Sequence, residues 1–141
     1  MMAPYAAAKH GLEGLSDTLR LELGGSGMHV SVIEPGFIAT SMGGKLERDT
    51  EAWLRRLPAD GRSWYGRSLR ALAATIGREA ANGSPPEVVA GAVAHALTSR
   101  RPRTRYAVGA GAKRLVLLSR VLPDRLMDRL LLRAVGLTAT G

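Results

Sequence analysis

The stretch that decides the fold is Tyr5-Ala6-Ala7-Ala8-Lys9, which opens an amphipathic segment near the start of the chain. Residues four apart share one face of a helix, so the Tyr5 hydroxyl and the Lys9 ammonium are predicted to approach a common point. A phenol is a poor proton donor or acceptor at neutral pH, and a neighbouring cation favours its phenolate form. The spacing therefore fits an acid/base pair. It also fits a half-buried tyrosine beside an exposed lysine at a helix start.

A helix over residues 4–24 is expected because apolar residues recur along one face. This apolar stripe consists of Ala8, Leu12, Leu15, Leu19 and Leu23. Residues 24–27 are rich in glycine and end the helix, and residues 28–33 form a β-rich run that Pro35 and Gly36 close. A helix followed by a strand is half of a βαβ unit, which requires a parallel sheet. The loop after the strand is where open α/β sheets place their ligands.

Residues 41–56 and 63–80 are each expected to form a helix, with Pro58 and Gly61 between them. This section carries both tryptophans and Tyr65. Two interpretations stay open, an apolar lid over a substrate and a surface excursion that packs its few aromatic residues on the core.

Ser84-Pro85-Pro86-Glu87 matches a capping box with proline at the first helical position, and predicts a helix that ends near Ser99. His95 lies off its apolar face and is expected at the surface. A strand over residues 105–109 follows, and then helices over residues 111–121 and 123–135, the second ended by Gly136.

Composition limits the class of protein. The 141 residues are 45% hydrophobic and 23% charged, which is typical of one globular domain. The sequence contains no cysteine, which excludes disulfides and thiolate metal sites and favours a reducing, cytoplasmic location; no metal site is predicted. No apolar run is long enough to span a membrane. The first four residues do not resemble a signal peptide, so none is expected.

The net charge of +8 is confined to one end of the chain. Residues 1–99 hold ten basic and ten acidic residues, whereas residues 100–141 hold ten basic residues against Asp124 and Asp128. With their amphipathic pattern, the last two helices suggest a module for a membrane surface or another anionic partner, and therefore a peripheral membrane location as the alternative. A solvated helix face explains the same charges. Without aromatic interleaving, the basic turn at 100–103 does not favour a nucleic-acid partner.

Residues 4–40 resemble the short-chain dehydrogenase/reductase family, through the motif Y-x-x-x-K at Tyr5 and Lys9 and the motif P-G-x-x-x-T from Pro35 to Thr40. The resemblance implies an NAD- or NADP-dependent oxidoreductase on a Rossmann-type, doubly wound parallel sheet. It implies that Tyr5 exchanges the proton of a small alcohol or carbonyl substrate during hydride transfer. Lys9 would support Tyr5 and bind the nicotinamide ribose.

The resemblance also implies a cofactor loop. Pro35, Gly36 and Ile38 would face the nicotinamide, and Thr40 would lie near its carboxamide or the phosphates. The parts of this partial Rossmann-like domain would be the catalytic helix and strand, a substrate lid, a helix with the last strand, and basic amphipathic helices, over residues 1–40, 41–83, 84–110 and 111–141.

Family members carry a Gly-rich phosphate loop and a catalytic serine before the tyrosine, and this sequence contains neither. The chain is therefore expected to be the C-terminal portion of an α/β fold, mostly helical and lacking the nucleotide-binding half. A truncated gene or a misplaced start codon would explain it. Alone, the chain is expected to be poorly folded and inactive; a separate chain carrying the missing half or a homo-oligomer partner would complete it.

Overall fold

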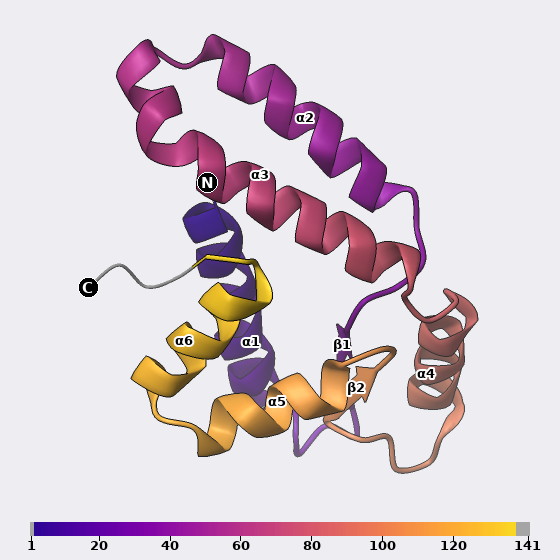
Figure 1. Cartoon of the computed structure of the whole chain (residues 1–141). Helices are drawn as coiled ribbons and strands as arrows, with labels where there is room; N and C mark the ends of the chain where they lie inside the picture. The colour runs from indigo at the N-terminus through magenta and orange to yellow at the C-terminus, as the bar shows by residue number, and fades with distance from the viewer. Residues whose placement is uncertain (1, 138–141) are drawn as a thin grey trace. The chain divides into compact units, whose positions relative to one another are not determined.

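The computed structural model describes residues 2–137, within which six helices and two short strands form (Figure 1). The fold is α/β and mostly helical, as predicted. In chain order the elements are α1 Met2–Glu22, β1 Val32–Pro35, α2 Met42–Arg56, α3 Ala59–Ala81, α4 Glu87–Thr98, β2 Arg105–Val108, α5 Ala112–Val121 and α6 Asp124–Ala134.

The elements form two compact units, each built from two separate segments of the chain. The first unit contains the segment up to Pro35 and Glu87–Val108, and so holds α1, α4 and both strands. The second contains Gly36–Pro86 and the segment from Gly109 onward, and so holds α2, α3, α5 and α6. Each unit is described by itself.

The first unit is organised on a parallel pair of strands, β1 and β2, whose register runs from Val32 beside Arg105 to Pro35 beside Val108. The strand predicted over residues 28–33 was placed too early. It begins only at Val32, because β2 offers four residues for pairing. Pro35 ends the strand, which suits a residue without a backbone donor.

Helix α4 packs on both strands of this unit. It begins at Glu87, so the capping box predicted at Ser84 is wrong. The backbone of Ser84 instead pairs with the loop after β1, since its N–H donates to the Phe37 carbonyl and its own carbonyl accepts from the Ala39 N–H, both at 2.9 Å.

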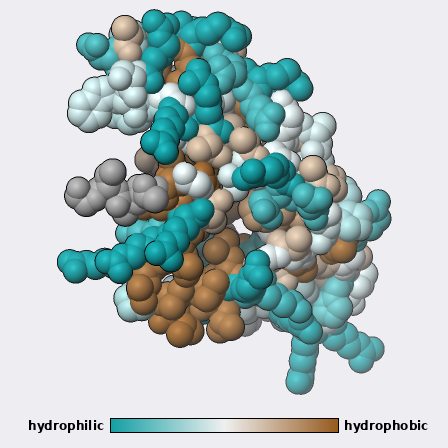
Figure 2. All heavy atoms as spheres, viewed as in Figure 1, coloured by the Kyte–Doolittle hydropathy of each residue, from teal (hydrophilic) through white to brown (hydrophobic). Residues whose placement is uncertain are grey.

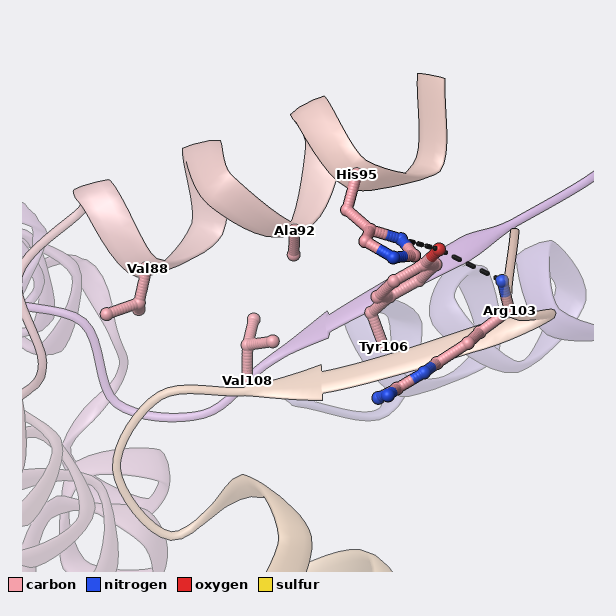
Figure 3. A pocket seen from close by; sticks show the side chains of 6 residues that line it. All are labelled: Val88, Ala92, His95, Arg103, Tyr106 and Val108. Atoms are coloured by element: carbon pink, nitrogen blue, oxygen red, sulfur yellow. Dashed lines mark hydrogen bonds between the residues drawn. The ribbon is translucent and has the colours of Figure 1, made fainter. Parts of the chain in front are cut away.

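The contact between α4 and β2 is centred on Tyr106, which is only 6% exposed (Figure 3). Its hydroxyl accepts a hydrogen bond from the backbone N–H of Arg103 and lies 2.9 Å from Nδ1 of His95. His95 is exposed, as predicted, but its ring is fixed edge-on to Tyr106. Beside this pair opens a cavity of about 220 Å³.

The second unit contains a helical hairpin, in which α2 and α3 pack along each other (Figure 1). Leu54, in the last turn of α2, is 1% exposed. The helices approach closely at Gly43, where an added Cβ would lie 3.0 Å from the Cα of Gly77. Helix α3 starts at Ala59, directly after Pro58, so Gly61 lies inside the helix rather than between two helices as predicted.

We predict that Tyr106→Phe weakens the contact between α4 and β2. The change leaves the Arg103 amide without its acceptor, at a cost of about 1–2 kcal/mol. Amide hydrogen exchange at Arg103 should therefore accelerate roughly 5- to 30-fold. Tyr65→Phe, at a tyrosine that is 60% exposed, is the matched control. Unchanged exchange at Arg103 in Tyr106→Phe, or equal acceleration in the control, would contradict this account of the contact.

Candidate active site

Tyr5 and Lys9 lie one turn apart on α1, and the structure brings their side chains together. The Lys9 ammonium lies 5.5 Å from the centroid of the Tyr5 ring, which is a cation–π contact. Tyr5 is 57% exposed, so a ligand has access to its hydroxyl. This contact is to the ring, so the predicted approach of the ammonium to the hydroxyl and the catalytic role of the pair stay predictions.

The apolar stripe of α1 is exposed. Leu12 and Leu15 are 52% and 55% exposed, Leu19 is 36% exposed, and α1 contains no buried residue. Leucine side chains gain about 1.5–3 kcal/mol each from full burial, so this helix face forgoes most of the hydrophobic stabilisation that its sequence offers. Within the first unit, the helix that carries Tyr5 is not held by packing of this stripe.

Arg105 of β2 attaches the polar side of α1 to the strands. Its guanidinium lies 2.9 Å from carboxylate oxygens of Glu13 and Asp17 on α1, and 3.1 Å from a carboxylate oxygen of Glu34 on β1. One side chain therefore joins three elements. The sequence signal for this contact is the acidic pair Glu13 and Asp17, one turn apart on the side of the helix away from the leucines, which sequence reasoning did not use.

The carboxylates around Arg105 change the electrostatics of the cluster. Hydrogen bonds from Arg105 and then from Arg20 hold the pKa of Asp17 below its ordinary value of 3.8, against a smaller opposing effect of burial. The hydrogen bonds of Arg105 to Asp17, which has the larger effect, and to Glu13 raise the pKa of Arg105 above its ordinary value. The pair of Arg105 and Asp17 is therefore charged at neutral pH.

The predicted cofactor loop begins where β1 ends, at Pro35, and continues in the second unit. We call its packing there the loop clasp: residues 36–39 lie between residues 83–84 and residues 109–112. The Phe37 N–H donates to the Ala110 carbonyl at 3.0 Å, and residues 37 and 39 make the backbone bonds to Ser84. The clasp thereby fixes Ile38. The Thr40 hydroxyl accepts a bond of 3.4 Å from the N–H of Met42 at the start of α2.

Glycine is required in the clasp by close backbone approach. A Cβ on Gly36 would overlap the carbonyl oxygen of Ala110, and one on Gly83 would lie 2.7 Å from the carbonyl carbon of Ile38. Gly109 has a φ of +83°, which L side chains rarely adopt. Gly109-Ala110-Gly111 therefore helps to build the clasp, and it does not resemble a phosphate loop.

The predicted site residues thus form two groups. Tyr5, Lys9 and Pro35 belong to the first unit, whereas Gly36, Ile38 and Thr40 belong to the second. A hydroxyl and an ammonium on one exposed helical turn suit the diol of a nicotinamide ribose. The sequence lacks the G-x-x-x-G-x-G loop that would suit the cofactor's phosphates. Within the first unit, Tyr5 and Lys9 therefore fit the ribose of such a cofactor, and a cofactor role of the loop in the second unit stays a prediction.

Comparison of the sequence with known proteins finds related dehydrogenases. The family model described as short chain dehydrogenase matches residues 1–51, which include Tyr5, Lys9 and the motif from Pro35 to Thr40. The chain is 38% identical to "Retinol dehydrogenase 5" of Mus musculus over 132 residues, which is 90% of this chain and 42% of that protein. These matches relate the chain to the short-chain dehydrogenase/reductase family.

Further curated relatives are similar over a comparable share of their length. The chain is 33% identical to "17-beta-hydroxysteroid dehydrogenase type 6" of Homo sapiens over 92% of this chain and 42% of that protein. It is 30% identical to "NADPH-dependent 3-dehydrocapnine reductase" of Ornithobacterium rhinotracheale over 92% of this chain and 44% of that protein. The chain therefore spans less than half the length of these curated relatives. No solved structure matches it significantly.

Across residues 2–137, no helix combines the length and the hydrophobicity that crossing a membrane requires.

We predict that Gly36→Ala opens the loop clasp. The added methyl group meets backbone atoms that have little freedom to move, so local stability should fall by about 2–4 kcal/mol. The amides of Phe37, Ala39 and Ser84 should then exchange roughly 30- to 1,000-fold faster. The control is Gly44→Ala on α2, where an added Cβ meets only the end of the Arg48 side chain and alanine favours the helix. Undisturbed exchange in Gly36→Ala would contradict the clasp.

We predict that acid releases α1 from Arg105. Because the pKa of Asp17 is lowered in the folded chain, its ion pair stabilises the first unit above about pH 3.8 and is lost as the pH falls through the folded-state pKa. Carboxyl ¹³C NMR should show the Asp17 midpoint below 3.8, and Arg105→Gln should raise it toward that value. Arg70→Gln, which removes the partner of Glu51, is the control. If the titration midpoint of Asp17 is the same in Arg105→Gln as in the wild type, the contact is absent in solution.

Proposed function

We propose that the chain is the catalytic-tyrosine portion of an NAD(P)-dependent oxidoreductase that interconverts an alcohol and a carbonyl compound by hydride transfer. The observation that carries the proposal is the contact of Lys9 with the Tyr5 ring on one exposed turn, at a Y-x-x-x-K motif that lies within the match to the short chain dehydrogenase family model. In this proposal the chain is the C-terminal part of a Rossmann-type, doubly wound sheet.

In the proposed reaction, Tyr5 is the acid/base residue. Its hydroxyl donates a proton to the carbonyl oxygen during reduction, which leaves a phenolate, and the phenolate accepts the alcohol proton during oxidation. The Lys9 ammonium stabilises negative charge on the phenol oxygen and donates hydrogen bonds to the ribose of the cofactor. Bound NAD or NADP supplies or accepts the hydride. The loop from Pro35 through Gly36, Ile38 and Thr40 binds the nicotinamide end of the cofactor, with the loop clasp holding it in shape.

The proposed substrate is an apolar alcohol or its carbonyl counterpart. The names of two relatives refer to retinol and to 17-beta-hydroxysteroids. Residues 41–83, which contain α2 and α3, are proposed as the substrate lid. On α3, Trp64 is 80% exposed and Tyr65 is 60% exposed, so two aromatic side chains are available to contact an apolar substrate.

The remainder of the proposed enzyme supplies what α1 and β1 lack. Two parallel strands alone bury too little surface for independent stability. A strand edge that is unpaired in the first unit leaves backbone N–H and C=O groups available to pair with another strand. The exposed leucines of α1 require a cover. We propose that a nucleotide-binding portion, encoded in frame before Met1 or carried by another chain, pairs with β1 and covers the α1 stripe. Residues 1–141 alone are then inactive.

The test uses the chain joined to the reading frame that directly precedes Met1. With NADH or NADPH and a panel of apolar carbonyl compounds, we expect turnover that Tyr5→Phe lowers about 10²- to 10⁴-fold in kcat. Lys9→Met should also lower kcat, and Lys113→Met on α5 is the control with the same loss of charge.

Two results would overturn the proposal. Turnover that survives Tyr5→Phe would show that another residue is the acid/base. Cofactor-dependent turnover by residues 1–141 alone would show that no further portion is needed.

A further inference from the structure

Helices α5 and α6 of the second unit carry an apolar patch bordered by basic side chains. Figure 2 shows hydrophobic residues gathered over these two helices, with hydrophilic side chains extending beside them. We call this surface the tail patch. Its apolar members are 44% to 69% exposed and comprise Leu115, Leu117, Val121, Leu126, Leu130 and Leu131. Exposed apolar surface of this extent on neighbouring helices is typical of an interaction site.

The order of side chains around α6 matches an amphipathic helix that lies in a membrane–water interface. Leu126 and Leu130 share a face because they are four residues apart. Arg125, Arg129 and Arg133 are also spaced by four and follow the adjoining face. Long arginine side chains beside a leucine face extend toward an aqueous or polar layer while their stems cover apolar surface. The leucines of such a helix enter an apolar layer and the arginines reach anionic groups above it.

The helix is closed at both ends without help from another element. At its start, the N–H groups of Leu126 and Met127 donate to the carbonyl of Pro123 at 2.9 and 3.1 Å. At its end, Gly136 has a φ of +70°, and the N–H of Leu137 donates to the carbonyl of Leu132 at 2.8 Å, as in a Schellman motif. The two ends of α6 are therefore defined by its own backbone hydrogen bonds, which fixes the length of its amphipathic face.

Charge selects the partner. Residues 112–137 contain six basic residues, Lys113, Arg114, Arg120, Arg125, Arg129 and Arg133, against Asp124 and Asp128. Within residues 2–137, the three arginines of α6 make no ion pair with an acidic side chain. A second copy of the chain would bring the same positive surface to the patch and would be repelled, whereas an anionic lipid surface is complementary.

We propose that the tail patch docks on an anionic membrane surface, with the leucines of α6 entering the headgroup region and its arginines binding lipid phosphates. The site is separate from Tyr5 and Lys9 in sequence and in unit, so it stands or falls independently of the proposed reaction. It would hold the protein at the surface where apolar alcohols partition.

The experiment is co-sedimentation of the full 141-residue chain with vesicles of phosphatidylcholine containing about one-third phosphatidylglycerol, against vesicles of phosphatidylcholine alone. We expect binding to the anionic vesicles that weakens as salt rises. The triple charge reversal Arg125→Glu, Arg129→Glu, Arg133→Glu should weaken binding at least about 100-fold. The triple change Leu126→Ser, Leu130→Ser, Leu131→Ser should weaken it at least about 30-fold.

The matched control reverses Arg48, Arg56 and Arg67 to glutamate, which makes the same change in net charge at exposed positions of α2 and α3. The proposal requires that this control bind far better than the α6 charge reversal. The proposal is overturned if the wild-type chain does not bind anionic vesicles. It is also overturned if both charge reversals weaken binding equally, or if the leucine variant binds as well as the wild type. Self-association without vesicles that the leucine variant abolishes would assign the patch to a second copy, and would also overturn it.

Discussion

One guanidinium attaches α1 to the strands of the first unit. Arg105 reaches Glu13 and Asp17 on α1 and Glu34 on β1, so a helix whose apolar face is exposed is attached through its polar face. Ion pairs of partly exposed groups contribute little stability each, and salt weakens them. They do fix direction, because a guanidinium has planar geometry and binds carboxylates in a defined orientation. Arg105 therefore sets the orientation of the helix that presents Tyr5, while it adds little to the stability of the unit.

The exposed stripe of α1 completes this argument. Leu12 and Leu15 stand at helical spacing with more than half of their surface exposed, on a helix with no buried residue. Leucines repeated along one helix face stabilise a protein only if that face is buried. The two-stranded sheet also requires further cover, since parallel strands are normally buried on both faces. Both features agree with a chain that spans less than half the length of its curated relatives.

Local signals predicted much of the fold and the central pair of the site. The spacing of Tyr5 and Lys9 placed them on one turn, and Gly136 and Pro58 marked helix boundaries correctly. The errors arose where distant segments meet. Ser84 has the sequence of a helix cap, but its backbone is bound to residues 37 and 39, and no local pattern shows that pairing. Strand β1 is shorter and later than its β-rich run because its partner offers only four residues, and the contacts of Arg105 join positions more than seventy residues apart.

The central claim is that α1 is built to be covered by a further portion of a dehydrogenase. The most direct measurement is amide hydrogen exchange at Leu12, Leu15 and Leu19, compared between residues 1–141 alone and the chain joined to its upstream reading frame. Burial of the stripe predicts exchange at least roughly 100-fold slower in the longer protein. Equal exchange rates in the two proteins would show that the stripe stays exposed, and would contradict the account.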